Sequence, residues 1–121
     1  MSPVIAIAVG LVGGVGAIAR FALDGAVGRR AGREFPFGTL LVNVLGAFVL
    51  GVLVGTAVDQ SAYRLVGTGL VGAFTTFSTW MFESHRLGED GEARFGVLNF
   101  VFSLVLGLGA AWAGRHLGRW L

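Results

Sequence analysis

The chain has 121 residues, of which 55% are hydrophobic and only 13% are charged, with nine arginines, no lysine and no cysteine. A typical soluble domain carries about 25% charged residues, so this composition predicts a membrane protein. The lack of cysteine excludes disulfides and thiol catalysis. No metal-ligand cluster or catalytic triad can be assembled from the other residues, and we expect a protein that is not an enzyme.

Four uncharged runs cover residues 1–19, 35–58, 65–82 and 95–114. Each is close to or above the length of about 18 residues that crosses a hydrocarbon core. We predict an all-α, multi-pass protein of the cell (inner or plasma) membrane, with one domain over 1–121 and helices at about 3–23, 36–58, 65–82 and 95–115. The first run lacks a positively charged region and a convincing cleavage site, so we expect it to be kept as a helix.

The loop arginines do not determine an orientation. One side of the membrane would carry three arginines and the other five, which are Arg64, Arg115 and Arg119 against Arg29, Arg30, Arg33, Arg86 and Arg94. So small a bias permits insertion either way. Arginines on short loops suit lipid headgroups, and we expect no nucleic-acid partner. Arg20, at the end of the first run, either reaches the headgroups or has a structural role at a subunit interface.

In the second run, Thr39 and Asn43 are four residues apart and share a helix face. An asparagine in the middle of a membrane is costly, so its amide must meet a neighbouring helix or a wet pathway. Two hypotheses remain open. Asn43 either bonds to another helix, which is worth about 0.6 kcal/mol on average, or acts as a donor toward an anion.

The third run contains a cluster of hydroxyls and aromatic rings from Gly72 to Trp80. Its four hydroxyls in five positions, at Thr75, Thr76, Ser78 and Thr79, compete with the backbone for helical hydrogen bonds. The sequence therefore predicts a break in this helix. A break exposes carbonyls, which suit a cation such as Na⁺, and amides, which suit anions. Phe77 and Trp80 lie on one face, either as packing or with their positive ring edges toward an anion.

The fourth run places Asn99 and Ser103 four residues apart as a short polar track. Small residues recur at a spacing of four in Gly10 and Gly14, Gly51 and Gly55, and Ala110 and Gly114. Such pairs let helices approach closely. None of the four runs contains a carboxylate, which favours passive conduction over proton-coupled transport.

Three segments together resemble the signatures of the Fluc (CrcB) fluoride channels, in order and spacing. They are GGVGAIARF at 13–21, FGTLLVNVLG at 37–46 and GAFTTFSTW at 72–80. The resemblance implies an antiparallel, dual-topology dimer that conducts fluoride passively through two pores and lowers its cytoplasmic concentration. It also implies a broken third helix that holds a structural Na⁺ at the dimer interface through the backbone carbonyls of Gly72 and Thr75.

The same resemblance assigns roles to individual side chains. It implies a fluoride pore formed by Asn43, Phe77, Trp80, Thr76, Thr79 and Ser103, with Arg20 as the first-helix arginine and Glu83 near a pore mouth. Three positions depart from the family pattern. Trp80 replaces a phenylalanine, Ala73 replaces a glycine, and Gly107 stands where a hydroxyl is expected. These departures leave open whether the partner is a second copy of the chain or a homologue.

Two other classes of membrane protein also have four short helices. A small multidrug-resistance transporter would need a carboxylate in its first helix, and residues 1–19 contain none. A structural membrane-assembly subunit would use the same glycines and hydroxyls for packing alone.

Overall fold

The computed structural model describes residues 2–32 and 34–121. Met1 and Arg33, which count in the first run and in the arginine balance, lie outside the described residues. The helices are α1 (Pro3–Ala31), α2 (Phe37–Thr56), α3 (Gln60–Ala62), a π-helix η1 (Tyr63–Val71), α4 (Gly72–Phe74), α5 (Phe77–Glu89) and α6 (Ala93–Arg119).

The predicted all-α class is confirmed for the part of the chain that the structure describes, which contains no strand. Four helical spans are long and apolar enough to cross a membrane: Pro3–Ala31, Phe37–Thr56, Gln60–Glu89 and Ala93–Arg119. The third of these spans comprises α3, η1, α4 and α5 in succession.

Local capping determines where the helices begin and end. Ser2 accepts a hydrogen bond from the Ile5 amide, and Pro3 occupies the first turn of α1. This helix runs to Ala31, eight residues beyond the predicted end at 23, and stops where Gly32 adopts a positive φ of 79°. Ala57, with φ 53° and ψ 45°, ends α2 in the left-handed conformation.

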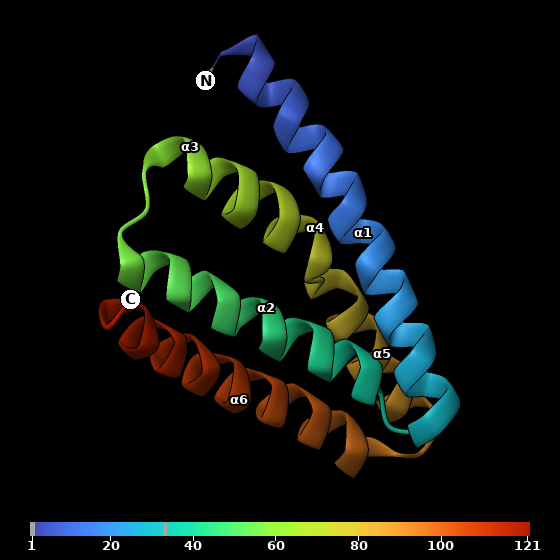
Figure 1. The fold of residues 1–121 in the computed structure, drawn as a ribbon. Helices are drawn as coiled ribbons and strands as arrows, with labels where there is room; N and C mark the ends of the chain where they lie inside the picture. The colour runs from blue at the N-terminus through green and yellow to red at the C-terminus, as the bar shows by residue number, and fades with distance from the viewer. Residues whose placement is uncertain (1, 33) are drawn as a thin grey trace.

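The helices form two groups that meet at α2. Figure 1 shows α2 and α6 side by side and running in the same direction, with α1 crossing η1 and α4 on the other side of α2. Glycines allow the close approach of α2 and α6. A Cβ at Gly51 would collide with the Ala111 carbonyl, and one at Gly114 with the Phe48 carbonyl. By contrast, Gly10 and Gly14 on α1 meet nothing within 4 Å in the same chain.

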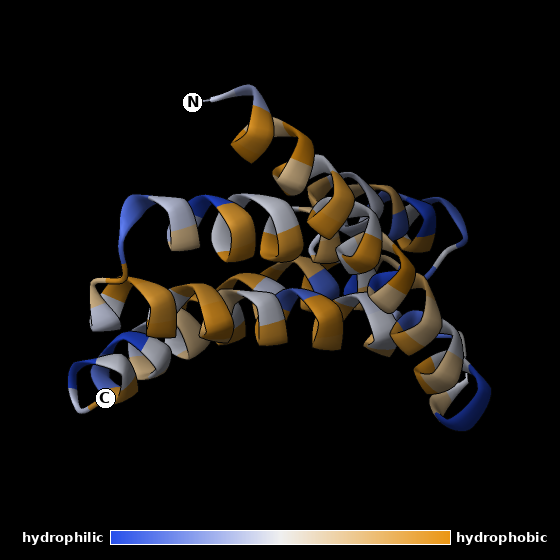
Figure 2. Cartoon of the chain, turned by 45° about the horizontal axis from the view of Figure 1, so that its top comes forward, coloured by the Kyte–Doolittle hydropathy of each residue, from blue (hydrophilic) through white to orange (hydrophobic). Residues whose placement is uncertain are grey.

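The outer surface is apolar, and several of the best-buried residues are polar. Thr39, Asn99 and Ser103 are buried, as is Val42, whereas α1 exposes a row of large apolar side chains: Val4, Ile7, Leu11, Val15, Ile18 and Phe21. Figure 2 shows apolar residues along the helices and hydrophilic ones mostly near their ends and connections. This is the pattern of a protein whose helices face lipid or another helical partner.

Candidate functional site

The centre of the site is a local interruption between α4 and α5. Thr75 and Thr76 both have extended backbones, with φ −86° and ψ 161° at Thr75 and φ −148° and ψ 121° at Thr76. The Thr76 hydroxyl accepts a hydrogen bond from the Thr79 amide at 3.2 Å and thereby caps α5. The Thr75 hydroxyl donates to the Val71 carbonyl at 3.0 Å. Both threonines use their hydroxyls to satisfy backbone groups at the interruption.

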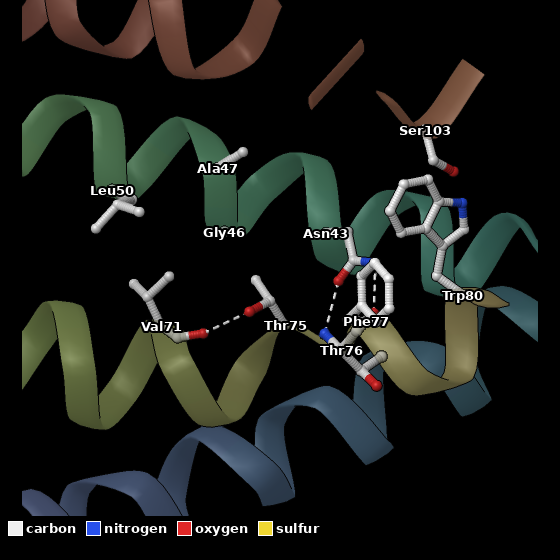
Figure 3. A pocket seen from close by; sticks show the side chains of 10 residues that line it. All are labelled: Asn43, Gly46, Ala47, Leu50, Val71, Thr75, Thr76, Phe77, Trp80 and Ser103. Carbon is white, nitrogen blue, oxygen red and sulfur yellow. Dashed lines mark hydrogen bonds between the residues drawn. The ribbon is translucent and has the colours of Figure 1, made fainter. Parts of the chain in front are cut away.

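Asn43 of α2 binds the backbone at the interruption through both ends of its amide. Its Nδ2 donates to the Thr76 carbonyl at 2.9 Å, and its Oδ1 accepts from the Thr76 amide at 2.8 Å (Figure 3). An uninterrupted helix would use the Thr76 amide to bond the Gly72 carbonyl. Asn43 therefore replaces a helical hydrogen bond with a contact between two helices.

The backbone carbonyls on the two sides of the interruption differ in their hydrogen bonds. The Ala73 carbonyl accepts a hydrogen bond from Arg20 Nε of α1 at 3.3 Å. Among the described residues, no hydrogen bond reaches the carbonyl oxygens of Gly72 and Thr75. Arg20 thus binds the backbone of α4 in the same chain, beside two carbonyls that accept no hydrogen bond from the described residues.

The two aromatic rings of the motif are in contact and join α5 to α6. Phe77 and Trp80 pack at a centroid distance of 5.5 Å and an interplanar angle of 88°, and Trp80 stacks on Phe100 at 5.3 Å. The Trp80 indole Nε1 donates to the Asn99 carbonyl at 3.3 Å. The indole N–H of Trp80 is therefore hydrogen-bonded to the backbone of α6. Phe77, by contrast, is 69% exposed.

A pocket of about 290 Å³ brings several of the predicted site residues together. Asn43, Thr75, Thr76, Phe77, Trp80 and Ser103 line it, along with Gly46, Ala47, Leu50 and Val71 (Figure 3). These residues come from α2, η1, α5, α6 and the interruption. The pocket offers an amide, hydroxyls and ring edges, and none of its lining residues carries a charge.

The remaining predicted residues lie outside this pocket. Thr79 hydrogen-bonds to Thr76 through its amide, and its hydroxyl lies 3.2 Å from that of Thr76. Glu83 accepts a hydrogen bond from the Thr39 hydroxyl at 2.5 Å and lines a second, smaller pocket of about 140 Å³ with Asp24 and Arg86. Gly72 and Arg20 likewise do not line the larger pocket.

Sequence reasoning missed one set of contacts beside the pocket. Asn99 Nδ2 donates to the Ser84 hydroxyl at 2.7 Å, and Ser84 donates to the Trp80 carbonyl at 2.9 Å. The spacing of Asn99 and Ser103 indicated a polar face on α6. Ser84 falls outside the predicted third helix, which ended at residue 82, and no signal connected it with Asn99.

This fold and this pocket define a small multi-pass membrane protein with an uncharged polar site at an interrupted helix. Comparison with known proteins identifies its family. Residues 7–115 match the family described as "CrcB-like protein, Camphor Resistance (CrcB)", and the chain belongs to this family. The resemblance predicted from the three motifs is thereby confirmed.

The relatives of the chain share its length as well as its sequence. It is 53% identical to "Fluoride-specific ion channel FluC 2" of Mycolicibacterium paratuberculosis, over 93% of each chain. It is 52% identical to "Fluoride-specific ion channel FluC 2" of Mycobacterium tuberculosis, over 95% of this chain and 88% of that one. It is 43% identical to "Fluoride-specific ion channel FluC" of Geobacter sulfurreducens, over the whole of both chains. These names describe ion channels, which agrees with the expectation of a protein that is not an enzyme.

Proposed function

We propose that this protein is a passive, fluoride-selective channel that exports fluoride across the cell membrane and so lowers its concentration in the cytoplasm. The observation that carries the proposal is the pocket at the interrupted helix, where Asn43, Phe77, Trp80 and Ser103 converge. The relatives named as fluoride-specific channels support the choice of ion.

The pocket suits a small, strongly hydrated anion. A pore must replace the water around such an ion with hydrogen-bond donors, and the ion must still be able to leave. Asn43 Nδ2 carries two hydrogens, and the hydrogen bond to the Thr76 carbonyl uses one of them. The Ser103 hydroxyl and the positive edges of the aromatic rings add further weak donors. Because no lining residue is cationic, nothing in the pocket would trap fluoride.

An antiparallel dimer with dual topology would complete this pocket. Phe77 is largely exposed in the single chain. A Cβ added at Gly10 or Gly14 of α1 would meet nothing within 4 Å. Small residues with open space allow a second helix to pack closely. The balanced arginines of the loops permit insertion in both orientations. The partner is a second copy of the chain or a homologue.

We further propose that the interruption is the functional break of the third helix and that it holds a structural Na⁺ at the dimer interface. The carbonyls of Gly72 and Thr75 receive no hydrogen bond from the described residues. Carbonyl oxygens are the ligands that hard cations prefer. A bound Na⁺ would supply positive charge that fixes these carbonyls, while Arg20 holds the Ala73 carbonyl beside them.

In this proposal Thr76, Thr79 and Glu83 support the pore from positions around the pocket. Thr79 and Thr76 hold the first turn of α5, which carries Phe77. Glu83, which accepts a hydrogen bond from the Thr39 hydroxyl, lies one helix turn beyond Trp80 on α5. This position is toward the end of the span, and so toward one mouth of the proposed pore.

Efflux from liposomes tests the proposal. The purified protein is reconstituted alone, and fluoride release is followed with a fluoride electrode in Na⁺ and in Na⁺-free buffer, with chloride release as the control. We expect fast release of fluoride, little release of chloride, and a loss of activity on prolonged removal of Na⁺. If folded protein released no fluoride, a self-sufficient channel would be excluded, and co-expression with a homologue would then test the heterodimer.

A further inference from the structure

Two buried polar atoms on one face of α6 lack hydrogen-bond partners among the described residues. They are Asn99 Oδ1 and Ser103 Oγ. Asn99 is fully buried, and Ser103 is 8% exposed. The two residues are one helix turn apart, so their side chains are neighbours on the helix surface. A buried polar group without a partner is costly, and two adjacent ones indicate that a small polar group binds between them.

The surroundings of Asn99 fix which way its amide points. Nδ2 donates to the Ser84 hydroxyl at 2.7 Å and lies 3.5 Å from the Trp80 carbonyl. A carbonyl oxygen only accepts hydrogen bonds, so the NH₂ end must face Trp80 and Ser84. The Oδ1 end is therefore held on the other side of the amide, away from these two acceptors.

The chemistry of Oδ1 determines what can bind there. An amide oxygen is an acceptor only, so it repels an anion and requires a donor. We propose that one water molecule binds between Asn99 Oδ1 and Ser103 Oγ and donates one hydrogen to each. The Ser103 hydroxyl hydrogen is then left for an anion in the pocket that Ser103 lines.

This arrangement makes Asn99 a positioning residue for Ser103, and it rests on the proposed function only in taking the anion to be fluoride. Without Asn99 Oδ1, nothing among the described residues would hold this water against Ser103 Oγ, and the hydroxyl would no longer be fixed with its hydrogen toward the pocket. The hydroxyl would then be free to turn its lone pairs toward the pocket, where they repel fluoride. The water thus keeps Ser103 oriented as a donor on the pocket side.

A double-mutant cycle in liposomes tests this role. We expect Asn99→Leu and Ser103→Ala each to slow fluoride efflux about tenfold, the effect of losing one hydrogen bond to an ion. The double variant is expected to be no slower than Ser103→Ala alone, because Asn99 acts only through Ser103. Ser61→Ala, which removes an exposed hydroxyl on α3, is the matched control. A double variant about a hundredfold slower than wild type would show independent roles and overturn the inference, as would wild-type efflux from either single variant.

A high-resolution crystal structure of the wild-type protein tests the water directly, even if Asn99→Leu fails to fold. We expect a density peak within hydrogen-bonding distance of both Asn99 Oδ1 and Ser103 Oγ that stays when fluoride is replaced by another anion. A direct bond between the two side chains, or a peak that follows the anion, would overturn the proposal. If wild-type protein alone conducted no fluoride, the proposed self-sufficient channel would fail, and this density would decide the water bridge separately.

Discussion

At the scale of single residues, Asn43 performs one of the two tasks that the sequence left as alternatives and is placed for the other. Its amide joins α2 to the backbone of Thr76 through two hydrogen bonds, and it also lines the pocket. The contact between helices therefore does not exclude a role toward an anion. It places the amide at the pocket and fixes its orientation.

Replacing Asn43 tests both tasks. Asn43→Ala removes two hydrogen bonds and leaves the backbone amide and carbonyl of Thr76 without partners. At about 0.6 kcal/mol for each bond within a membrane, we expect about 1 kcal/mol of destabilisation and a loss of fluoride efflux. Thermal unfolding in detergent and efflux from liposomes measure the two effects. An unchanged efflux rate would remove Asn43 from the pathway, whatever happens to stability.

Phe77 offers a cleaner test of the pore because it is exposed and makes no hydrogen bond through its side chain. Phe77→Ile keeps an apolar side chain but removes the aromatic edge, and we expect slower fluoride efflux from a protein that still elutes like wild type in size-exclusion chromatography. Phe82→Ile is the matched control. Phe82 lies on the same helix and is 66% exposed, but it does not line the pocket. Equal effects of the two substitutions would contradict the assignment of Phe77.

At the scale of helices, the close contact of α2 and α6 depends on positions where a side chain has no room. Gly51 and Gly55 face the Ala111 and Arg115 carbonyls of α6, and Gly114 and Gly118 face Phe48 and Val52 carbonyls of α2. Two pairs of small residues, one pair on each helix, thus form a continuous seam. The pocket lies beside this seam, since α2 supplies Asn43 and α6 supplies Ser103.

A methyl group added to this seam is expected to destabilise the protein. Gly51→Ala would force its Cβ against the Ala111 carbonyl, and overpacking of this kind costs about 1–3 kcal/mol. Gly109→Ala on α6 is the matched control, since nothing lies within 4 Å of its added Cβ. Thermal unfolding in detergent should show a lower midpoint for Gly51→Ala and little change for Gly109→Ala. Equal midpoints would mean that the seam tolerates a wider separation.

The sequence predicts the helices better than their ends, and the motif better than its contacts. Hydropathy gives four spans because each must cross the same thickness of hydrocarbon. It places the end of α1 too early, because the helix extends beyond the uncharged run. Its last turn contains Arg29 and Arg30, and Gly32 ends it. The hydroxyl cluster indicates an interruption near Thr75. The bond from Trp80 to the Asn99 carbonyl depends on how α5 packs against α6, and no local pattern carries that information.

At the scale of the whole molecule, a single chain leaves its apolar surface and its pocket open on one side. α1 exposes a row of large apolar side chains, and Phe77 projects from α5 with most of its ring uncovered. Lipid can cover the apolar side chains, but it cannot supply hydrogen bonds to an ion in the pocket. A second protomer can do both, which is why the proposed channel requires a dimer.

Dual topology predicts that each end of the third span lies on both sides of the membrane in the population of molecules. Because the chain has no cysteine, single introduced thiols can test this. Gln60→Cys and Glu89→Cys place single thiols at exposed positions at the two ends of the third span, Gln60–Glu89, and so on opposite sides of the membrane. If the protein inserts in both orientations, a membrane-impermeant maleimide added outside intact cells should label about half of each variant. After the membrane is permeabilised, labelling of both should become complete.

With one orientation, the outside reagent would label one variant fully and the other not at all. An antiparallel homodimer would then be excluded, because no oppositely oriented copy of the chain would exist to complete the pocket, and the partner would have to be a homologue inserted the other way.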